Sequence, residues 1–264
     1  MGQALVAKGK IKLKNFNPGY HDGLKKEVAK KETIRLAVNL GEMQNLLYAN
    51  ADHSVLILLQ GMDTSGKDGA ARHLLEFVNP AGVETASFKA PSTEERAHDF
   101  LWRIHKQVPR YGNIGVFNRS HYEEVLISRV LKLVPVETWK KRYDQINDFE
   151  KMLIENRVVL LKFFLHISKA EQRERLESRL KDRTKNWKFS VEDLKMRSHW
   201  NEFQEAYEDM LNKCNTSSAP WHIVPADNKW YRDLVIAQTV VAAMDKLKLK
   251  WPRSTEDLSK IKVK

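Results

Sequence analysis

The sequence predicts an α/β fold with three layers, in which helices cover both faces of a five-stranded parallel sheet. Residues 55–59 (VLILL) and 158–167 (VVLLKFFLHI) are apolar runs without alternation, which is typical of strands buried on both faces. Segments with helical periodicity separate these runs from shorter apolar runs. Strands that alternate with helices pair in parallel through right-handed crossovers, so the order of the elements predicts the architecture.

The first part of the chain predicts a basic arm followed by a long helix. Residues 1–20 are basic and end at Pro18-Gly19. A helix is expected from roughly His21 to Tyr48, because its apolar residues fall on one stripe. This helix packs either across the core or against another subunit, and the sequence leaves both uses open. The first strand, 55–59, then leads through a glycine loop to a helix over 70–78.

The remaining elements follow from apolar runs, capping boxes and prolines. The other predicted strands cover 83–89, 114–117, 158–167 and 222–224. The other predicted helices cover 92–108, 121–133, 137–156, 168–180, 190–214 and 230–247. We therefore expect one domain over 21–250, in which about 173–197 form a helical lid, and a charged tail over 251–264.

The bulk composition narrows the class of protein. A chain of 264 residues with 42% hydrophobic and 30% charged residues suits one globular domain. A single cysteine, Cys214, excludes an internal disulfide framework and suits a reducing cytosol, so we expect a cytoplasmic protein. No apolar run suggests a signal peptide or reaches the length of a membrane span, so no membrane contact is expected.

The net charge of +11 favours an anionic partner. Charge alone leaves nucleic acid, an anionic membrane and a polyphosphate-like substrate open. No nucleic-acid reader motif is recognisable, and the basic residues gather around two segments, 61–69 and 173–188, which are described below. We therefore expect no nucleic-acid partner.

A phosphate-binding loop follows the first strand. Gly61 and Gly66-Lys67 have the spacing G-x-x-x-x-G-K, between a strand and a helix start, which is the context that this motif requires. Glycines let the backbone N–H groups point inward, the helix N-terminus adds positive potential, and Lys67 adds a mobile charge. The loop residues expected to contact phosphate are Gly61, Thr64, Ser65, Gly66, Lys67, Asp68 and Gly69.

Two aspartates distinguish this loop from the usual pattern. Asp68 stands where most such loops have a Ser or Thr that binds Mg²⁺, and Asp63 lies inside the loop. A carboxylate that faces phosphate requires a cation between them or a proton to handle. Asp63 is therefore expected to bind Mg²⁺, with Mn²⁺ as the alternative ion, or to orient an attacking oxygen. The alternative for the whole segment is a glycine turn with two solvated aspartates.

Further candidates follow the other strands, because ligands of such sheets bind beyond the carboxyl ends of the strands. These candidates are Lys89, Asn118, Arg119, His121, Glu123 and Glu124. Asn118 occupies the place of a Walker B aspartate and can offer Mg²⁺ an amide oxygen, or it caps the next helix; the two uses are compatible. His121 is a candidate for phosphate binding, although a lone histidine is more often structural.

The segment after residues 158–167 is rich in arginine and predicts a lid that closes over the transferred phosphate. Arg179 and Arg183 occupy the lid position, whereas Arg173 and Arg175 are equally compatible with a solvated helix face. Trp187 and Phe189 either stack on a base or pack the lid down, and packing is the favoured use.

These motifs together resemble the polyphosphate kinase 2 family, in the family's order, from about residue 30 to 245. The matching segments are GMDTSGKDG, SFKAPSTEE, HDFLWRIHKQVPRYG, FNRSHYEEVLISRV, LKFFLHISKAEQRERLESRL, WKFSVEDL and APWHIVPADNKWYRDLV. The resemblance implies a thymidylate-kinase-like P-loop fold with a lid. It also implies reversible, Mg²⁺-dependent phosphoryl transfer between inorganic polyphosphate and nucleotides, in a homo-oligomer (dimer or tetramer).

The resemblance also assigns roles to individual residues. By it, Asp63 is the essential loop aspartate, Lys67 the loop lysine and Arg119 the phosphate-binding arginine, while Arg179 and Arg183 are similar to the lid arginines. The segment FNRSHYE, rather than FDRSWYN, is similar to the class III branch, which accepts AMP as well as ADP. That branch commonly has Asp where this chain has Glu124, which leaves open whether Glu124 acts on metal or through water.

The expected reaction is attack by the terminal phosphate of a nucleotide on the end phosphate of the polyphosphate chain. Adenine nucleotides are the expected partners, with guanine nucleotides as an alternative. The rival hypotheses are an ATP-dependent nucleotide or nucleoside kinase of the same fold, and a nucleic-acid-binding protein.

Overall fold

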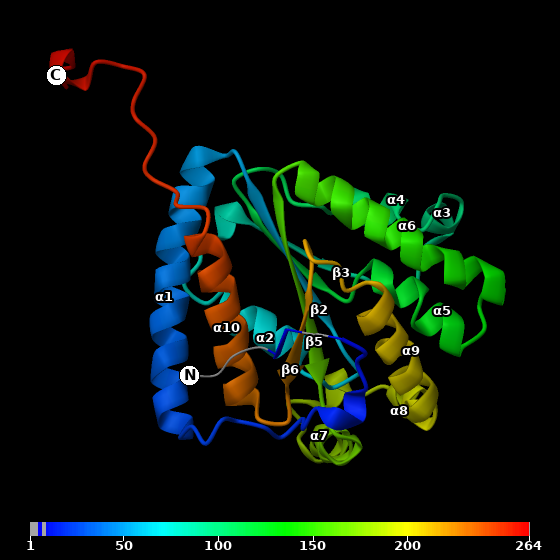
Figure 1. The fold of residues 1–264 in the computed structure, drawn as a ribbon. Helices are drawn as coiled ribbons and strands as arrows, with labels where there is room; N and C mark the ends of the chain where they lie inside the picture. The colour runs from blue at the N-terminus through cyan, green and yellow to red at the C-terminus, as the bar shows by residue number, and fades with distance from the viewer. Residues whose placement is uncertain (1–4, 7–8, 264) are drawn as a thin grey trace.

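The computed structural model describes residues 5–6 and 9–263, and its strands form one sheet in the order β1-β6-β5-β2-β4-β3 (Figure 1). The five parallel strands are β2 (Ser54–Gln60), β3 (Val83–Ser87), β4 (Ile114–Asn118), β5 (Val158–His166) and β6 (Trp221–Pro225). The predicted α/β fold with five parallel strands is therefore confirmed. A short strand that was not predicted, β1 (Leu5–Val6), pairs antiparallel with β6 at the edge.

The register of the sheet aligns the carboxyl ends of three strands. All seven residues of β2 are buried, as the apolar run predicts. Asn118 at the end of β4 lies opposite Leu59 of β2 on one side and Ser87 of β3 on the other. The segments that follow these strands therefore meet at one edge of the sheet.

Helices cover both faces of the sheet (Figure 1). One face carries α1 (Lys26–Asn50), α2 (Lys67–Leu74) and α10 (Lys229–Asp245), with α1 packed along α10. The other face carries α6 (Val136–Glu155) and α9 (Trp200–Lys213). The helix α7 (Lys169–Lys181) follows β5. Single 3₁₀ turns form at η1 (Leu13–Asn15), η2 (Pro80–Gly82), η4 (Asn186–Lys188) and η5 (Leu258–Lys260).

Three predicted helices are interrupted. The predicted helix 92–108 is divided into α3 (Thr93–Arg96) and α4 (Trp102–His105). The Asp99 side chain between them accepts a hydrogen bond from the N–H of Leu101 at 2.9 Å, which competes with helical bonding. The predicted helix 121–133 is a 3₁₀ turn, η3 (His121–Glu124), and a short α5 (Ile127–Val130). Non-helical backbone at Leu126 separates the two.

The third interruption lies in the lid region. His199, with φ −91° and ψ 27°, divides the predicted helix 190–214 into α8 (Val191–Ser198) and α9. The predicted start of this helix at Ser190 is confirmed, because the Ser190 side chain caps α8 by accepting a hydrogen bond from the N–H of Glu192.

The two ends of the chain differ in how they pack. Of the predicted basic arm (1–20), residues 1–4 and 7–8 lie outside the described residues, as does residue 264 of the predicted tail. Ile11 and Leu13 are buried, and their N–H groups donate to Asn212 and Glu208 of α9. Residues 251–263 are exposed and extend away from the domain (Figure 1). Over the described residues, the helices are too short or too polar to cross a bilayer.

Candidate functional site

The loop between β2 and α2 requires its glycines. Gly61 and Gly66 have φ values of +149° and +95°, a region that side chains rarely adopt. A Cβ on Gly66 would also lie 1.9 Å from Nη1 of Arg232, so a side chain there would displace this buried guanidinium. The loop therefore curls tightly and ends at the first residue of α2, as a phosphate-binding loop does.

Lys67 is buried in the centre of this loop. Its Nζ donates hydrogen bonds to the carbonyl oxygens of Gly61 (2.8 Å) and Met62 (3.1 Å). Burial disfavours the ammonium charge and lowers the pKa of Lys67, although Asp63 counters this effect. The charge is thus held at the point where the loop closes and is available to an anion that enters it.

Asp63 and Arg119 form an ion pair across the entrance of the loop. Arg119 Nη2 donates to Asp63 Oδ1 at 2.6 Å, although the two residues lie on different strand ends. Arg119 has a φ of +62°, which turns the chain directly after β4. The nearby carboxylates of Glu123 and Asp63 raise the pKa of Arg119, so its guanidinium stays charged.

Glu123 is the second carboxylate beside this ion pair. Burial raises the pKa of Glu123, while the charges of Arg119 and Lys67 oppose the shift. Gln60 at the end of β2 donates its Nε2–H to Glu123 Oε1 at 3.2 Å. The carboxyl group is therefore fixed beside the loop and is easier to protonate than a free glutamate.

A cavity of about 580 Å³ gathers most of the predicted site residues. Those that line it are Gly61, Asp63, Thr64, Gly66, Lys67, Asp68, Lys89, Asn118, Arg119, Glu123 and Arg179. They come from the ends of β2, β3 and β4 and from α7, so the crevice forms where the topology places it.

Asn118 faces Asp68 within the cavity, and its amide nitrogen donates to the Asp68 carboxylate. Ser120, rather than Asn118, caps the following turn, because its Oγ accepts the N–H of Tyr122. The capping use of Asn118 is therefore not observed, and its side chain points toward the loop.

Five predicted residues do not line this cavity. Glu124 faces α6 and pairs with Arg142 at 2.6 Å. His121 is buried against Glu150 of α6. The side chain of Ser65 is fully buried under the loop, and Gly69 lies inside α2.

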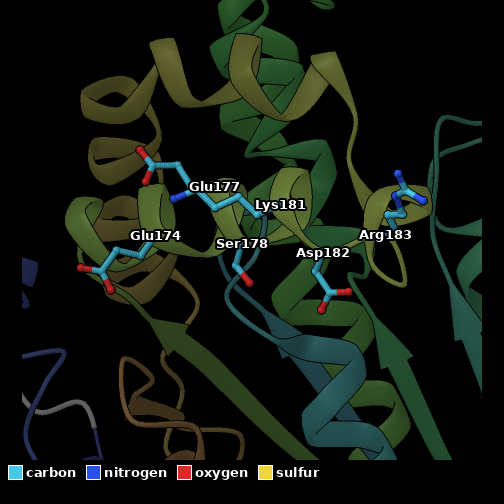
Figure 2. Close-up of a pocket in the computed structure, with 6 residues that line it drawn as sticks. All are labelled: Glu174, Glu177, Ser178, Lys181, Asp182 and Arg183. Carbon is cyan, nitrogen blue, oxygen red and sulfur yellow. The ribbon is translucent and has the colours of Figure 1, made fainter.

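Arg183 is the fifth residue outside the cavity. It lines a separate pocket with residues of α7 and the loop after it, and stands apart from the α7 side chains in that view (Figure 2). α7 ends at Lys181 and Asp182 has extended backbone (φ −100°, ψ 108°), so Arg183 does not continue the helix that carries Arg179.

The lid contributes a carboxylate that sequence patterns did not single out as a site residue. Arg179 Nη1 donates to Asp193 Oδ2 at 2.9 Å, and both side chains line the cavity. Burial and the charge of Asp63 raise the pKa of Asp193. The only sequence signal was the spacing Ser190–Asp193, which indicates a helix cap and so concealed this second use.

Two buried arginines support the loop from behind. Arg175 Nη1 donates to the carbonyl oxygens of Thr64 (2.8 Å) and Ser65 (3.0 Å), so the solvated alternative for Arg175 is wrong. Arg232 of α10 is also buried and points at the Ser65 carbonyl (3.4 Å). Its position in a mostly apolar helix gave no sequence signal for this contact.

The exposure of two further side chains distinguishes between the uses that the sequence left open. Arg173 is solvated and pairs with Glu177 along the helix, which agrees with the solvated alternative. The favoured packing use of Trp187 is not observed, because its side chain is 78% exposed at the rim of the cavity.

The donor set of the cavity suits a hydrated oxygen-bound cation. The described residues contain no cluster of three or more His, Cys, Asp or Glu placed to hold a metal by themselves. Mg²⁺ at phosphate sites commonly uses one or two carboxylates together with water and substrate oxygens. Asp63, with Glu123 or the Asn118 amide oxygen beside it, provides that number of ligands.

Comparison with known proteins agrees with this geometry. Residues 23–252 match the sequence model of the family described as Polyphosphate kinase 2 (PPK2). The chain is 44% identical over 255 residues to the AMP/ADP-polyphosphate phosphotransferase of Meiothermus ruber, with 96% of each protein covered. It is 42% identical over 274 residues to the ADP-polyphosphate phosphotransferase of Rhodopseudomonas palustris, with 93% of this chain and 94% of that protein covered.

A solved structure gives the same result for the fold. The crystal structure of polyphosphate kinase 2 from Arthrobacter aurescens superimposes with a TM-score of 0.94 at 40% identity. The superposition covers 97% of this chain and 92% of that chain. The likeness therefore includes the loop, the crevice and the lid.

Proposed function

The chain belongs to the polyphosphate kinase 2 family, and we propose that it transfers phosphoryl groups reversibly between inorganic polyphosphate and AMP or ADP. The observation that supports this most is the Asp63–Arg119 pair at the mouth of the loop that holds Lys67. An anion cradle with an acidic group inside it suits a substrate that brings both phosphate and a cation. The names of the two relatives supply the substrate class, AMP or ADP with polyphosphate.

The loop binds the end phosphate of the polyphosphate chain. Backbone N–H groups and Lys67 hold its oxygens, while Arg119 and Arg179 balance the charge that develops during transfer. An oxygen of the nucleotide's terminal phosphate forms a bond to this phosphorus. The bridging P–O bond of the chain breaks, and its electron pair remains on the shortened polyphosphate. No covalent intermediate with the protein is required.

We also propose that Mg²⁺, or Mn²⁺ in its place, binds at Asp63 with Glu123 or Asn118 as the second ligand. The ion would supply charge neutralisation between the two phosphates. When substrate binds, Arg119 would turn from the Asp63 carboxylate to phosphate oxygens. The carboxylate would then be available to hold the ion.

An assay without any nucleoside triphosphate tests the proposed function. Purified protein with AMP, long-chain polyphosphate and Mg²⁺ should produce ADP and then ATP, measured by ion-exchange chromatography. Polyphosphate provides the only transferable phosphoryl groups in this mixture. Product that forms only after addition of ATP or GTP would instead support the rival, an ATP-dependent nucleotide kinase.

We further propose that the protein works as a cytoplasmic homo-oligomer, a dimer or tetramer, and that guanine nucleotides are alternative acceptors. Exposed Val28, Ile34 and Val38 on α1 support an intersubunit contact, and the buried free thiol of Cys214 suits a reducing compartment. Light scattering after size exclusion measures the mass, and GMP in the assay above tests base selectivity.

A further inference from the structure

A fully buried cluster of polar side chains lies beneath the site, outside the cavity. It consists of Glu150 of α6, Lys162 of β5, and His121 and Tyr122 of η3, each at most 1% exposed. We name these four residues the Glu150 cluster. All four are ionisable groups that the proposed reaction does not use directly.

The other three members of the Glu150 cluster all contact the Glu150 carboxylate. Lys162 Nζ donates to Oε2 at 2.6 Å, and Tyr122 Oη donates to Oε1 at 2.6 Å. His121 Nε2 lies 3.2 Å from the same Oε1. Lys162 also donates to Tyr122 Oη (3.0 Å) and to the carbonyl of Cys214 (2.7 Å), which links three elements and the end of α9.

The protonation states make this arrangement stable. Burial alone would raise the pKa of Glu150, but Lys162 and His121 hold that pKa below its usual value. Burial and the Glu150 charge raise the pKa of Tyr122 well above its usual range, so its hydroxyl remains a donor. The carboxylate therefore stays charged and accepts several hydrogen bonds.

The cluster holds the middle of a turn whose two ends face the cavity. Arg119 and Glu123 flank the pair His121-Tyr122 and line the cavity, whereas the pair points into the core. Arg119 has a φ of +62°, an uncommon backbone conformation for a residue with a side chain. Such a conformation persists where the surrounding contacts fix it.

Stability alone does not explain a buried ion pair of this kind. Removing charges from water is costly, and apolar replacements of similar volume are often as stable or more stable. A geometric role is the alternative use, because three directional contacts to His121 and Tyr122 fix the turn more sharply than apolar packing does.

We propose that the Glu150 cluster is a positioning device that holds Arg119 and Glu123 in their arrangement for phosphoryl transfer. This inference rests on the proposed function for its kinetic readout. Its members are positioning residues, since none of them lines the cavity.

Tyr122→Phe is the primary test, because it removes one hydroxyl and preserves the ring that packs on Trp221. We expect kcat to fall about 10- to 100-fold, the effect of small displacements at reacting groups. The KM for AMP should change little. Gln44→Leu in α1 is the control, since Gln44 is equally buried but packs against Gly82; its kcat should equal that of the wild type.

A mutant cycle separates positioning from general loss of stability. If the cluster acts through the turn, Tyr122→Phe should reduce kcat by a smaller factor in an Arg119→Ala background than in the wild type. Equal factors in both backgrounds, or a wild-type kcat for Tyr122→Phe, would overturn the inference.

A second variant, measured by hydrogen exchange, tests the positioning role of the Glu150 cluster independently of the proposed phosphoryl transfer. Glu150→Gln/Lys162→Met neutralises the pair, and hydrogen exchange should accelerate at residues 119–124 while β2 stays protected. Exchange does not depend on turnover, so unchanged exchange in this variant overturns the inference even if the proposed function fails. If this double variant does not fold, the same exchange measurement on Tyr122→Phe decides.

Discussion

At the scale of single residues, carboxylates lie among cations in the cavity. Asp63, Glu123 and Asp193 face Lys67, Arg119 and Arg179. Arg119 is paired with Asp63 and Arg179 with Asp193. Lys67 instead donates to loop carbonyl oxygens, so a phosphate chain would replace carboxylates at the two arginines and carbonyls at the lysine. In the proposed reaction, phosphate oxygens replace Asp63 and Asp193 as the partners of Arg119 and Arg179.

Asp63→Asn tests the acidic residue of the loop. We expect turnover to fall by about 1000-fold or more, because the variant loses the carboxylate that we propose as the ligand of the cation. The midpoint of thermal unfolding should stay close to that of the wild type.

The matched control is Asp209→Asn, which removes a carboxylate paired with Arg129 outside the cavity. Its turnover should equal that of the wild type. Activity of Asp63→Asn at the level of this control would remove Asp63 from the mechanism.

Glu123 predicts a pH dependence of stability. Its pKa in the folded protein is raised above the ordinary 4.5, so the folded state binds more protons than the unfolded state above that pH. The contribution of Glu123 is therefore most favourable below pH 4.5 and is lost as pH rises through the folded-state pKa.

Urea unfolding of the wild type and Glu123→Gln across this range measures the difference. The free energy of unfolding of the wild type should decrease relative to the variant as pH rises. A constant difference between the two proteins would contradict the raised pKa.

At the scale of elements, two parts of α7 contact different partners. Arg175 in its middle is bonded to the loop carbonyls, whereas Arg179 one turn later is bonded to Asp193 of α8. The first part of α7 is thus fixed to the phosphate loop. We expect any closure over the substrate to involve the residues from Arg179 through α8.

Arg179→Met tests this part of the lid. The variant retains an apolar stem but lacks the charge that faces the transferred phosphate, so kcat should fall about 10- to 1000-fold. Arg173→Met is the matched control on the same helix, because Arg173 is solvated and pairs with Glu177. Steady-state kinetics with polyphosphate and AMP measure both variants, and equal values for them would exclude Arg179 from the site.

At the scale of the whole molecule, the net charge of +11 matches a polyanionic substrate better than a nucleotide. Polyphosphate has about one negative charge per phosphate and extends beyond the cavity, so it interacts with many surface cations. These exposed interactions are screened by salt, whereas contacts inside the cavity are screened much less.

The KM for polyphosphate should therefore rise steeply between about 0.05 and 0.3 M KCl, while the KM for AMP changes little. Initial rates at a fixed Mg²⁺ concentration give both values. Parallel increases in the two constants would show that long-range charge does not guide the polymer.

The sheet, the loop and the set of strand ends that form the crevice could be predicted from the sequence. These features depend on local signals: unbroken apolar runs at 55–59 and 158–167, and glycine spacing between a strand and a helix. Parallel topology then requires the carboxyl ends to meet, so Lys67, Asn118 and Arg119 could be assigned to one site before their distances were known.

Which of the neighbouring side chains face the cavity depends on tertiary packing and was not predictable from the sequence. The sequence offered His121, Glu123 and Glu124 as candidates, yet of these three only Glu123 lines the cavity. The segment 121–124 forms a 3₁₀ turn in which His121 and Tyr122 face Glu150 instead. Likewise, Asp193 and Arg175 acquire their contacts from partners 14 and 111 residues away. Contacts over such separations depend on how helices pack, which local patterns do not encode.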